Sequence, residues 1–558
     1  MVDNDSTSIA GAEDQSDENT KSDEQTIKTK YDQDLDNAEE KLNKGLFEDG
    51  KNILFNMYKD INDPQDAIYI IKAADLLNHS GLISDAEKFC NKAIEITSSC
   101  TPENVIIKKL ALHILAVIAG EACAHDIAHS IMSRLVEIFP EYNDVWMYCV
   151  FHMNYDPDQT QQKLKEMAEE WIKALVIPET KIDRPKPKAL NGRPLRIGYV
   201  SADFTYHPVG FLIRDVIVAH DHTRIEAFAY DNGPKEDNII KKIIALGCTV
   251  KNVRDLNDDE LAAMIRQDEI DVLVDLSGYT SGGRLGVFAR EPAPLMVSWL
   301  GYWATTGLKA IDAVLLDKWH APEWMDQYFT EKIVRLPHLR FCYQPLAGEP
   351  QVNFNLPCIE KGYVTFASFN NTLKINSTLL DCWAEILHKV ENSHLVLKWK
   401  TFHDQAVKER IRAAFARRGI SDTERIEFQG WSPLYDMLKE YYNVDIALDT
   451  FPFTGGMTTF NALWMGIPVV TLQGKSVIGR QGHAVLSELG LEELSAENYE
   501  HYINIAQGLA KNIKLLQVLR ITLRERMRKS SVVNVNLFTK NLEDCFYTLY
   551  EEKLKDVK

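Results

Sequence analysis

The sequence predicts an α/β protein with two doubly wound parallel sheets in tandem, preceded by an all-helical repeat region. Two observations lead to this fold class. Between residues 195 and 472, short apolar runs alternate with helix-like segments in two successive cycles, which is typical of parallel sheets covered by helices on both faces. Before residue 176, apolar residues follow the helical period and small residues recur at fixed offsets.

The first cycle predicts a domain over 195–345. Its opening apolar run ends in a polar turn and is the expected first strand. Further strands are expected at 225–230, 249–253, 272–276, 313–316 and 333–336, with helices at 211–220, 238–246 and 258–266.

The second cycle predicts a domain over 358–558 that ends in helices. A proline-containing stretch, 343–357, separates it from the first. The expected strands are 363–368, 393–398, 426–428, 446–448 and 469–472, and the expected helices are 378–389, 405–418, 435–442 and 458–465. Two such domains predict one cleft, into which the carboxyl ends of both sets of strands face.

The helical region is expected over 31–175 and contains a degenerate repeat resembling the tetratricopeptide repeat, whose period is about 34 residues. Three sets of residues share the offsets 0, 5, 9 and 12: Gly45, Gly50, Leu54 and Met57; Gly81, Ala86, Cys90 and Ala93; Cys123, Ala128, Met132 and Leu135. Small residues at the first two offsets are expected to let the two helices of a hairpin approach each other closely. The residues at the last two offsets are expected to form the buried stripe of the second helix. A plain helical bundle stays open as an alternative.

Two segments lack a core. Residues 1–30 are acidic and polar with almost no large apolar side chain, so we expect disorder. Residues 176–194 contain four prolines between basic residues and are expected to be a linker.

Composition excludes several function classes. The net charge of -19 argues against general nucleic-acid binding, which needs a basic surface. Nine scattered cysteines without a C-x-x-C pair indicate reduced thiols, and the N-terminus has no signal-peptide pattern. The expected location is the cytoplasm, with no membrane span.

Loops that follow strands face the ligand crevice of a parallel sheet, so they hold the candidate site residues. In the first domain these are His207, which can donate a hydrogen bond or move a proton, and the glycine-rich loop 276–285 with Tyr279 and Thr280. A third loop, 298–307, carries Thr306, three aromatic residues and two glycines. A turn histidine satisfied by backbone and a structural aromatic cluster are the alternatives.

In the second domain, Lys374 follows the first strand, where an ammonium group can stabilise a departing diphosphate. A solvated lysine is the alternative. After the strand at 446–448 comes a glycine turn that opens a helix, and helix N-termini bind phosphate. Its candidate residues are Gly455, Gly456, Thr458, Thr459 and Asn461. An ordinary threonine N-cap is the alternative there.

Arg480, with Lys475 and His483, is a further candidate for the anion pocket. The sequence has no Walker motif, G-x-S-x-G elbow, H-E-x-x-H motif, G-x-G-x-x-G fingerprint or metal-ligand cluster. We therefore expect no metal and no cofactor.

Together these stretches resemble the O-linked N-acetylglucosamine transferase and SPINDLY-like glycosyltransferases. The resemblance runs from about Pro194 to Glu552 and is carried by SADFTYHPVG, DVLVDLSGYTSGGRL, REPAPLMVSWLGYWATTG, FASFNNTLKIN, VDIALDTFPFTGGMTTFNALWMGIPVVTL and KLLQVLRITLRERM. The helical repeats in front fit the same family.

The resemblance implies a GT-B architecture of two Rossmann-like domains and an inverting, metal-independent transfer of a sugar from a UDP-sugar, UDP-GlcNAc being expected, to Ser or Thr of proteins. It implies acceptor proteins bound by the helical region and the cleft. It places the active-site histidine at His207 and the pyrophosphate lysine at Lys374. It places Asn371 near the nucleotide, and Leu300 and Gly301 in the donor-sugar loop. It places Thr458 and Asn461 in the phosphate- and ribose-binding turn.

Some positions depart from the family pattern and leave the donor open. Met437 stands where members often have a histidine, Asn461 where an acidic residue often contacts ribose, and Met264 and Arg266 where some carry an acid and a histidine. GDP-fucose or UDP-glucose is one alternative donor. An alternative from another function class is a non-catalytic scaffold, whose helical region binds partners and whose two α/β domains have lost activity.

Overall fold

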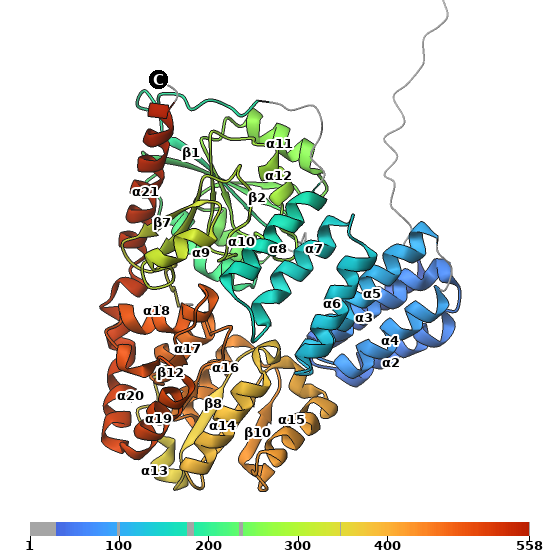
Figure 1. Ribbon diagram of the computed structural model, residues 1–558, viewed down its shortest axis with the longest axis vertical. Helices are drawn as coiled ribbons and strands as arrows, with labels where there is room; N and C mark the ends of the chain where they lie inside the picture. Colours follow the sequence, from blue (N-terminus) through green and yellow to red (C-terminus); the bar gives the residue numbers. More distant parts are fainter. Residues whose placement is uncertain (1–28, 98–100, 176–182, 234–237, 346–347, 557–558) are drawn as a thin grey trace, which may run out of the picture. The chain divides into compact units, whose positions relative to one another are not determined.

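The computed structural model describes residues 29–97, 101–175, 183–233, 238–345 and 348–556 (Figure 1). The chain divides into two compact units, residues 1–61 and 62–558. Residues 1–28 of the predicted disordered N-terminus and residues 176–182 of the predicted linker lie outside the described residues.

The first unit is a helical hairpin. Helices α1 (Lys30–Asn43) and α2 (Phe47–Asp60) are joined by a turn in which Gly45 has a φ of 75°. A Cβ atom on Gly50 would lie 2.7 Å from Cγ of Leu42. The glycine at the second repeat offset therefore allows α1 and α2 to pack closely, as the sequence predicts.

The second unit continues with six helices: α3 (Ala67–His79), α4 (Ile83–Ile96), α5 (Pro102–Glu121), α6 (His125–Ile138), α7 (Asn143–His152) and α8 (Gln161–Ala174). The first repeat offset has a different role from the predicted one. Gly81 and Cys123 have φ values of 78° and 59°, so these positions form the turn between paired helices rather than a helix contact. The predicted buried stripe is confirmed, because Leu54, Met57, Cys90, Ala93, Met132 and Leu135 are all buried.

A seven-stranded, wholly parallel sheet forms the first α/β domain, in the order β3-β2-β1-β4-β5-β6-β7. This is the doubly wound order of nucleotide-binding folds. Its strands are β1 (Leu195–Ser201), β2 (Ile225–Asp231), β3 (Thr249–Asn252), β4 (Val272–Asp275), β5 (Leu295–Ser298), β6 (Ala313–Asp317) and β7 (Lys332–Leu336). Its helices are α9 (Pro208–Val218), α10 (Ile239–Ile244), α11 (Asp258–Gln267) and α12 (Leu285–Ala289). Only β5 and the short α12 were not predicted.

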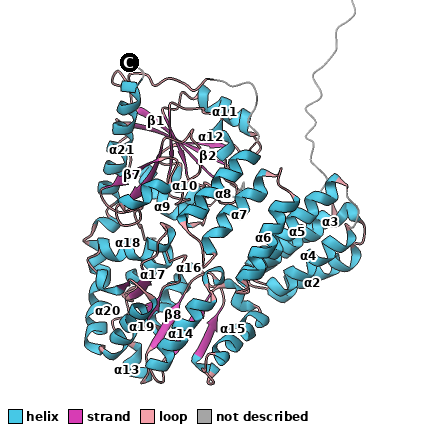
Figure 2. Cartoon of the chain, viewed as in Figure 1, coloured by secondary structure: helices cyan, strands magenta, loops and turns pink. Residues whose placement is uncertain are grey.

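The second sheet repeats this order over six parallel strands, β10-β9-β8-β11-β12-β13. Figure 2 shows helices, in cyan, around the magenta strands of both domains. Its strands are β8 (Thr365–Ser368), β9 (His394–Lys398), β10 (Ile426–Gln429), β11 (Ile446–Leu448), β12 (Val469–Leu472) and β13 (Ser495–Ala496). The accompanying helices are α13 (Pro357–Lys361), α14 (Ser377–Lys389), α15 (Gln405–Arg417), α16 (Leu434–Glu440), α17 (Met457–Trp464), α18 (Gln481–Glu488), α19 (Tyr499–Lys511), α20 (Ile513–Arg528) and α21 (Val535–Asp556).

Helices α7 and α8 share the hydrophobic core of the first α/β domain. The buried ring of Trp171 on α8 packs edge-on against Tyr279, with 5.0 Å between ring centroids. Nε1 of Trp303 donates to Oδ1 of Asn154, which follows α7, over 2.9 Å. The end of the helical region is thus built into the first domain.

The last helix, α21, returns to the first domain (Figure 1). The buried Glu543 accepts from the backbone N–H of Asp221 over 2.9 Å and lies 3.0 Å from Nδ1 of His220. The hydroxyl of Tyr550 donates to Asp271 over 2.9 Å. The two sheets are therefore connected by chain crossings both before β8 and after α20.

Among the helices of the described residues, we find none with the length and apolar character that crossing a bilayer requires.

Gly81 provides a test of how the helical region packs on the second domain. A Cβ atom there would lie 2.3 Å from the backbone oxygen of Lys400, so Gly81→Ala adds a clash to the cost of the left-handed backbone, about 1–2 kcal/mol. Gly362 has a similar φ of 77° with no atom near its Cβ position. We expect Gly81→Ala to lower the melting temperature clearly more than Gly362→Ala, and equal shifts in thermal unfolding would contradict this packing.

Candidate active site

A cavity of about 570 Å³ is lined by both α/β domains and by the end of the helical region. It lies at the carboxyl ends of strands from both sheets, where the sequence predicts a cleft. Nine of the predicted site residues line it: His207, Thr280, Leu300, Gly301, Asn371, Lys374, Gly456, Thr458 and Asn461.

Lys374 ends the short 3-10 helix η4 (Thr372–Lys374) that follows β8. Its Nζ donates to the backbone oxygen of Thr454 over 3.1 Å and to Oδ1 of Asn370 over 3.4 Å. It also lies 4.3 Å from the ring centroid of Phe453. No carboxylate of the described residues lies within ion-pair distance of this amine, and burial lowers the pKa of Lys374 to about 8. Lys374 is therefore not the freely solvated lysine of the alternative interpretation.

Phe453 links the lysine to all three parts of the second unit. Its ring stacks on Tyr155 of the helical region at 4.8 Å and meets Trp303 of the first domain edge-on at 5.0 Å. The cation of Lys374 therefore lies on an aromatic platform to which distant segments contribute.

Helix α17 presents an open N-terminus to the same cavity. Its N-cap is Gly456, and no side chain caps it. Thr458 is not an N-cap, because its hydroxyl donates instead to Oδ1 of Asn370 over 3.1 Å. The first backbone N–H groups of α17 thus remain available for an acceptor such as a phosphate oxygen.

Asp449, at the end of β11, shapes the glycine turn in front of α17. Its Oδ1 accepts from the backbone N–H of Gly455 over 2.6 Å and of Thr450 over 2.9 Å, and its Oδ2 accepts from the Thr471 hydroxyl over 2.7 Å. Burial raises the pKa of Asp449, which the Thr471 hydrogen bond and Lys374 oppose. Gly455 belongs to this turn through its N–H, and neither Gly455 nor Thr459 lines the large cavity.

Leu300 occupies an unusual backbone conformation at the cavity wall. Its φ is 67°, and the N–H of Gly301 donates to the oxygen of Trp299 over 2.9 Å, which closes a strained γ-turn. A Cβ atom on Gly301 would lie 1.8 Å from the backbone oxygen of Leu276. The predicted donor loop is therefore held tightly against the neighbouring strand end.

His207 is the N-cap of α9 and accepts from the N–H of Val209 through Nδ1 over 3.4 Å. The same Nδ1 lies 3.5 Å from Oδ2 of Asp203. Desolvation lowers the pKa of His207, and Asp203 only partly opposes this. The alternative of a backbone-satisfied turn histidine is correct for Nδ1, yet the ring also lines the cavity.

Four further predicted site residues, Tyr279, Thr306, Arg480 and Lys475, also lie outside the cavity lining. The hydroxyl of Tyr279 donates to the oxygen of Thr306 over 2.6 Å, and Thr306 donates its N–H to Glu331 over 2.7 Å, so both side chains are core residues. Nε of Arg480 donates to the oxygen of Trp319 over 2.7 Å. Lys475 is exposed and lies outside the residues that line the cavity.

Several residues that line the cavity were not predicted from the sequence, notably Arg340, Gln481, Trp399, Phe453 and Tyr155. Arg340 follows β7, so the rule that functional residues follow strands could have found it. No local signal marks Tyr155, because its place depends on how the helical region packs.

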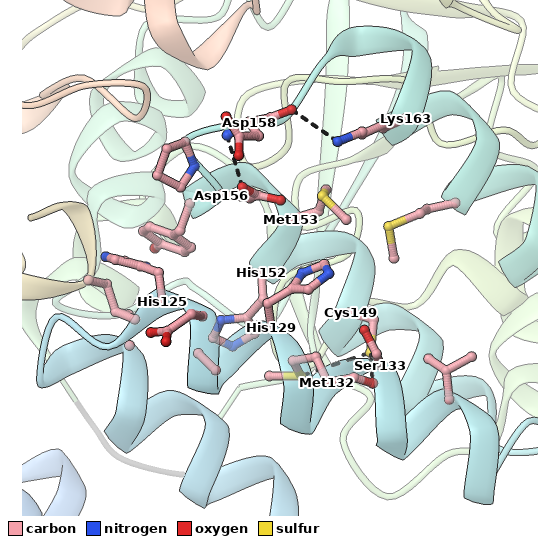
Figure 3. Close-up of a pocket in the computed structure, with 18 of the residues that line it drawn as sticks. His125, His129, Met132, Ser133, Cys149, His152, Met153, Asp156, Asp158 and Lys163 are labelled. Carbon is pink, nitrogen blue, oxygen red and sulfur yellow. Dashed lines mark hydrogen bonds between the residues drawn. The ribbon is translucent and has the colours of Figure 1, made fainter. Parts of the chain in front are cut away.

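A second cavity, of about 790 Å³, lies beside the first between α6, α7, α8 and the loop before α8 (Figure 3). Its polar side chains include His125, His129, His152, Asp126, Asp156, Asp158 and Lys163. His125 is tied to the second domain, since its Nε2 lies 2.9 Å from the oxygen of Ile375. Tyr155 lines both cavities.

Within the residues that the structure describes, we find no cluster of three or more His, Cys, Asp or Glu side chains suited to holding a metal ion. The expectation of metal independence stays a prediction.

Comparisons with known proteins assign this chain to one family. The model described as glycosyl transferase family 41 matches residues 123–344 and 351–542. Two relatives, each named a probable UDP-N-acetylglucosamine–peptide N-acetylglucosaminyltransferase SPINDLY, are 33% identical over 74% of this chain in Hordeum vulgare and 34% identical over 74% in Solanum lycopersicum. The matched regions cover 44% and 45% of those proteins, so this chain spans less than half their length.

A solved structure is also similar over almost the whole chain. A mutant of the O-GlcNAc transferase of Thermobaculum terrenum superposes with a TM-score of 0.84 at 28% identity, covering 95% of this chain and 100% of that one. The arrangement of helical region and two α/β domains is therefore shared with that protein.

The role of Asp449 can be tested by substitution. Asp449→Ala leaves buried N–H and hydroxyl donors without an acceptor, which we expect to cost about 2–4 kcal/mol of stability. Asp449→Asn keeps an oxygen for the two N–H groups, so its melting temperature should lie much nearer that of the unchanged protein. Equal losses in thermal unfolding would show that the carboxylate charge, not the hydrogen bonds, shapes the turn.

Proposed function

Because the chain belongs to glycosyl transferase family 41, we propose that it is a protein O-glycosyltransferase that transfers N-acetylglucosamine from UDP-N-acetylglucosamine to Ser or Thr hydroxyls. The observation that carries this proposal is the ammonium group of Lys374. It lines the interdomain cavity beside the uncapped N-terminus of α17 and has no ion-pair partner among the described residues.

The chemistry needs a cation at this position. The acceptor oxygen attacks the anomeric carbon from the face opposite the diphosphate, the bond to the diphosphate oxygen breaks, and UDP leaves with increased negative charge. Lys374 and the N–H groups of α17 stabilise that charge in place of a metal ion. Removing one preorganised donor of this kind typically lowers the rate about 100- to 1000-fold.

His207 supplies a neutral imidazole from the first domain. Because Nδ1 is occupied by the cap of α9 and by Asp203, Nε2 is the nitrogen that faces a substrate. We assign it to positioning the donor or the acceptor hydroxyl, which must lose its proton during transfer.

The nucleotide and the donor sugar occupy the cavity with Asn371, Thr458 and Asn461 near the diphosphate and ribose, and Leu300 and Gly301 near the sugar. Acceptor proteins approach through the helical region and the neighbouring cleft, where the second cavity provides room for a peptide segment. We also propose a cytoplasmic location, which the unpaired thiols of the described cysteines support.

Two measurements test the activity and the donor together. Co-expression with candidate acceptor proteins, followed by intact-mass spectrometry, should reveal an added HexNAc; a hexose or deoxyhexose would identify the alternative donors. Thermal-shift titration should show stabilisation by UDP and not by GDP, since a ligand of the folded state raises the melting temperature. Failure of every nucleotide to stabilise the protein would instead support the scaffold alternative.

The role of Lys374 is tested by Lys374→Ala, with Lys475→Ala as the matched control. Lys475 is an exposed lysine after β12 and does not line the cavity. We expect Lys374→Ala to lower turnover of a radiolabelled donor by about 100-fold or more, while Lys475→Ala changes it little. Unchanged turnover in the folded Lys374→Ala protein would refute the assignment.

A further inference from the structure

Arg340 is a buried arginine at the wall of the same cavity, on the crossover between the two domains, and its guanidinium is incompletely bonded. Only 2% of the residue is exposed. Nη1 donates to the oxygen of Leu300 over 3.1 Å, and Nη2 reaches Oε1 of Gln481 only at 3.5 Å. Within the described chain, Nε has no hydrogen-bond partner and no carboxylate forms an ion pair with the group.

Burial alone does not explain why the Arg340 guanidinium lacks a full set of hydrogen-bond acceptors. Arg520 is equally buried, yet its guanidinium donates to four backbone oxygens, those of Asn353, Tyr441, Tyr442 and Val444. A buried cation without full compensation costs several kcal/mol. Burial lowers the pKa of Arg340 to about 10, with only Asp317 acting against it. Its Nε and Nη2 are thus donors that an anion would satisfy.

Arg340 is linked to Lys374 through two intermediate groups. Gln481, its weak partner, donates through Nε2 to the oxygen of Thr454 over 3.4 Å. That oxygen is the one that accepts from Lys374 over 3.1 Å. Two cations from different domains therefore converge beside the N-terminus of α17, whose N-cap is Gly456.

The charges along the cavity favour an anion with more than one negative charge. Arg340 and Lys374 line it, whereas Glu349 is the one carboxylate among its described lining residues. A guanidinium offers directed, paired donors that suit phosphate oxygens, while an ammonium acts as a point charge.

We propose that Arg340 is a second diphosphate-binding residue, which donates from Nε and Nη2 to a phosphate oxygen of the nucleotide-sugar and of the departing nucleoside diphosphate. This inference rests on the proposed function. It adds no chemical step: the same bond to the anomeric carbon breaks, and Arg340 shares with Lys374 the charge that the leaving oxygen gains. Its bond to the Leu300 oxygen places this charge against the donor-sugar loop.

The test compares ligands with and without phosphate. Calorimetric titration of uridine and UDP is carried out on the full chain, on Arg340→Gln, and on Arg417→Gln as a control that removes the same charge from an exposed site on α15. We expect Arg340→Gln to weaken UDP binding about 10- to 100-fold, as charged hydrogen bonds predict, and to leave uridine binding unchanged. Arg340→Lys should restore part of the loss, and Arg417→Gln should bind both ligands normally.

Two results would overturn the inference while leaving the proposed function intact. One is UDP affinity in Arg340→Gln equal to that of the unchanged protein. The other is an equal loss for uridine and UDP, because Arg340 would then only hold the Leu300 turn in place. If the unchanged protein bound guanosine and GDP instead, the same comparison would be made with that pair. If it bound no nucleotide, the proposed function and this inference would both fail.

Discussion

The ammonium group of Lys374 donates only to uncharged oxygen atoms, and this uncompensated positive charge is the interaction on which the site depends. A backbone carbonyl and an amide oxygen orient the amine, and an aromatic face lies beneath it. A carboxylate in the same place would neutralise the lysine and remove its attraction for an anionic ligand. Asp449, whose charge raises the pKa of Lys374 against the effect of burial, is instead engaged by N–H groups and a hydroxyl of the turn.

This arrangement depends on chain segments that are far apart in sequence. Phe453 meets Lys374, Tyr155 and Trp303, which come from the second domain, the helical region and the first domain. Gly120 on α5 approaches the turn before Lys374 so closely that a Cβ atom would lie 2.5 Å from Leu373. The helical region therefore supports the site directly, and the family match begins within it, at residue 123.

Much of the fold could be predicted from the sequence because buried parallel strands are continuous apolar runs between turns. The strand at 446–448 agrees with β11 to the residue, and the helix predicted at 378–389 begins one residue late. β5 was missed because its four residues lie between prolines and an aromatic loop, too short a run to separate from its surroundings. The two-residue β13 leaves no periodic signal at all.

The site could be predicted less completely, for a physical reason. Position after a strand places a residue at the correct edge of the sheet but does not decide where its side chain points. Thr280 lines the cavity, while its neighbour Tyr279 is directed into the core by Trp171 and Thr306. Arg340 and Tyr155 become visible only once separate segments are brought together.

The ring of Tyr155 has one further consequence. Since it belongs to the walls of both cavities, the interdomain cavity and the cavity beside α6 have one aromatic side chain in common. The ring is buried and stacked on Phe453, so a substitution that displaced it would change the shape of both cavities at once.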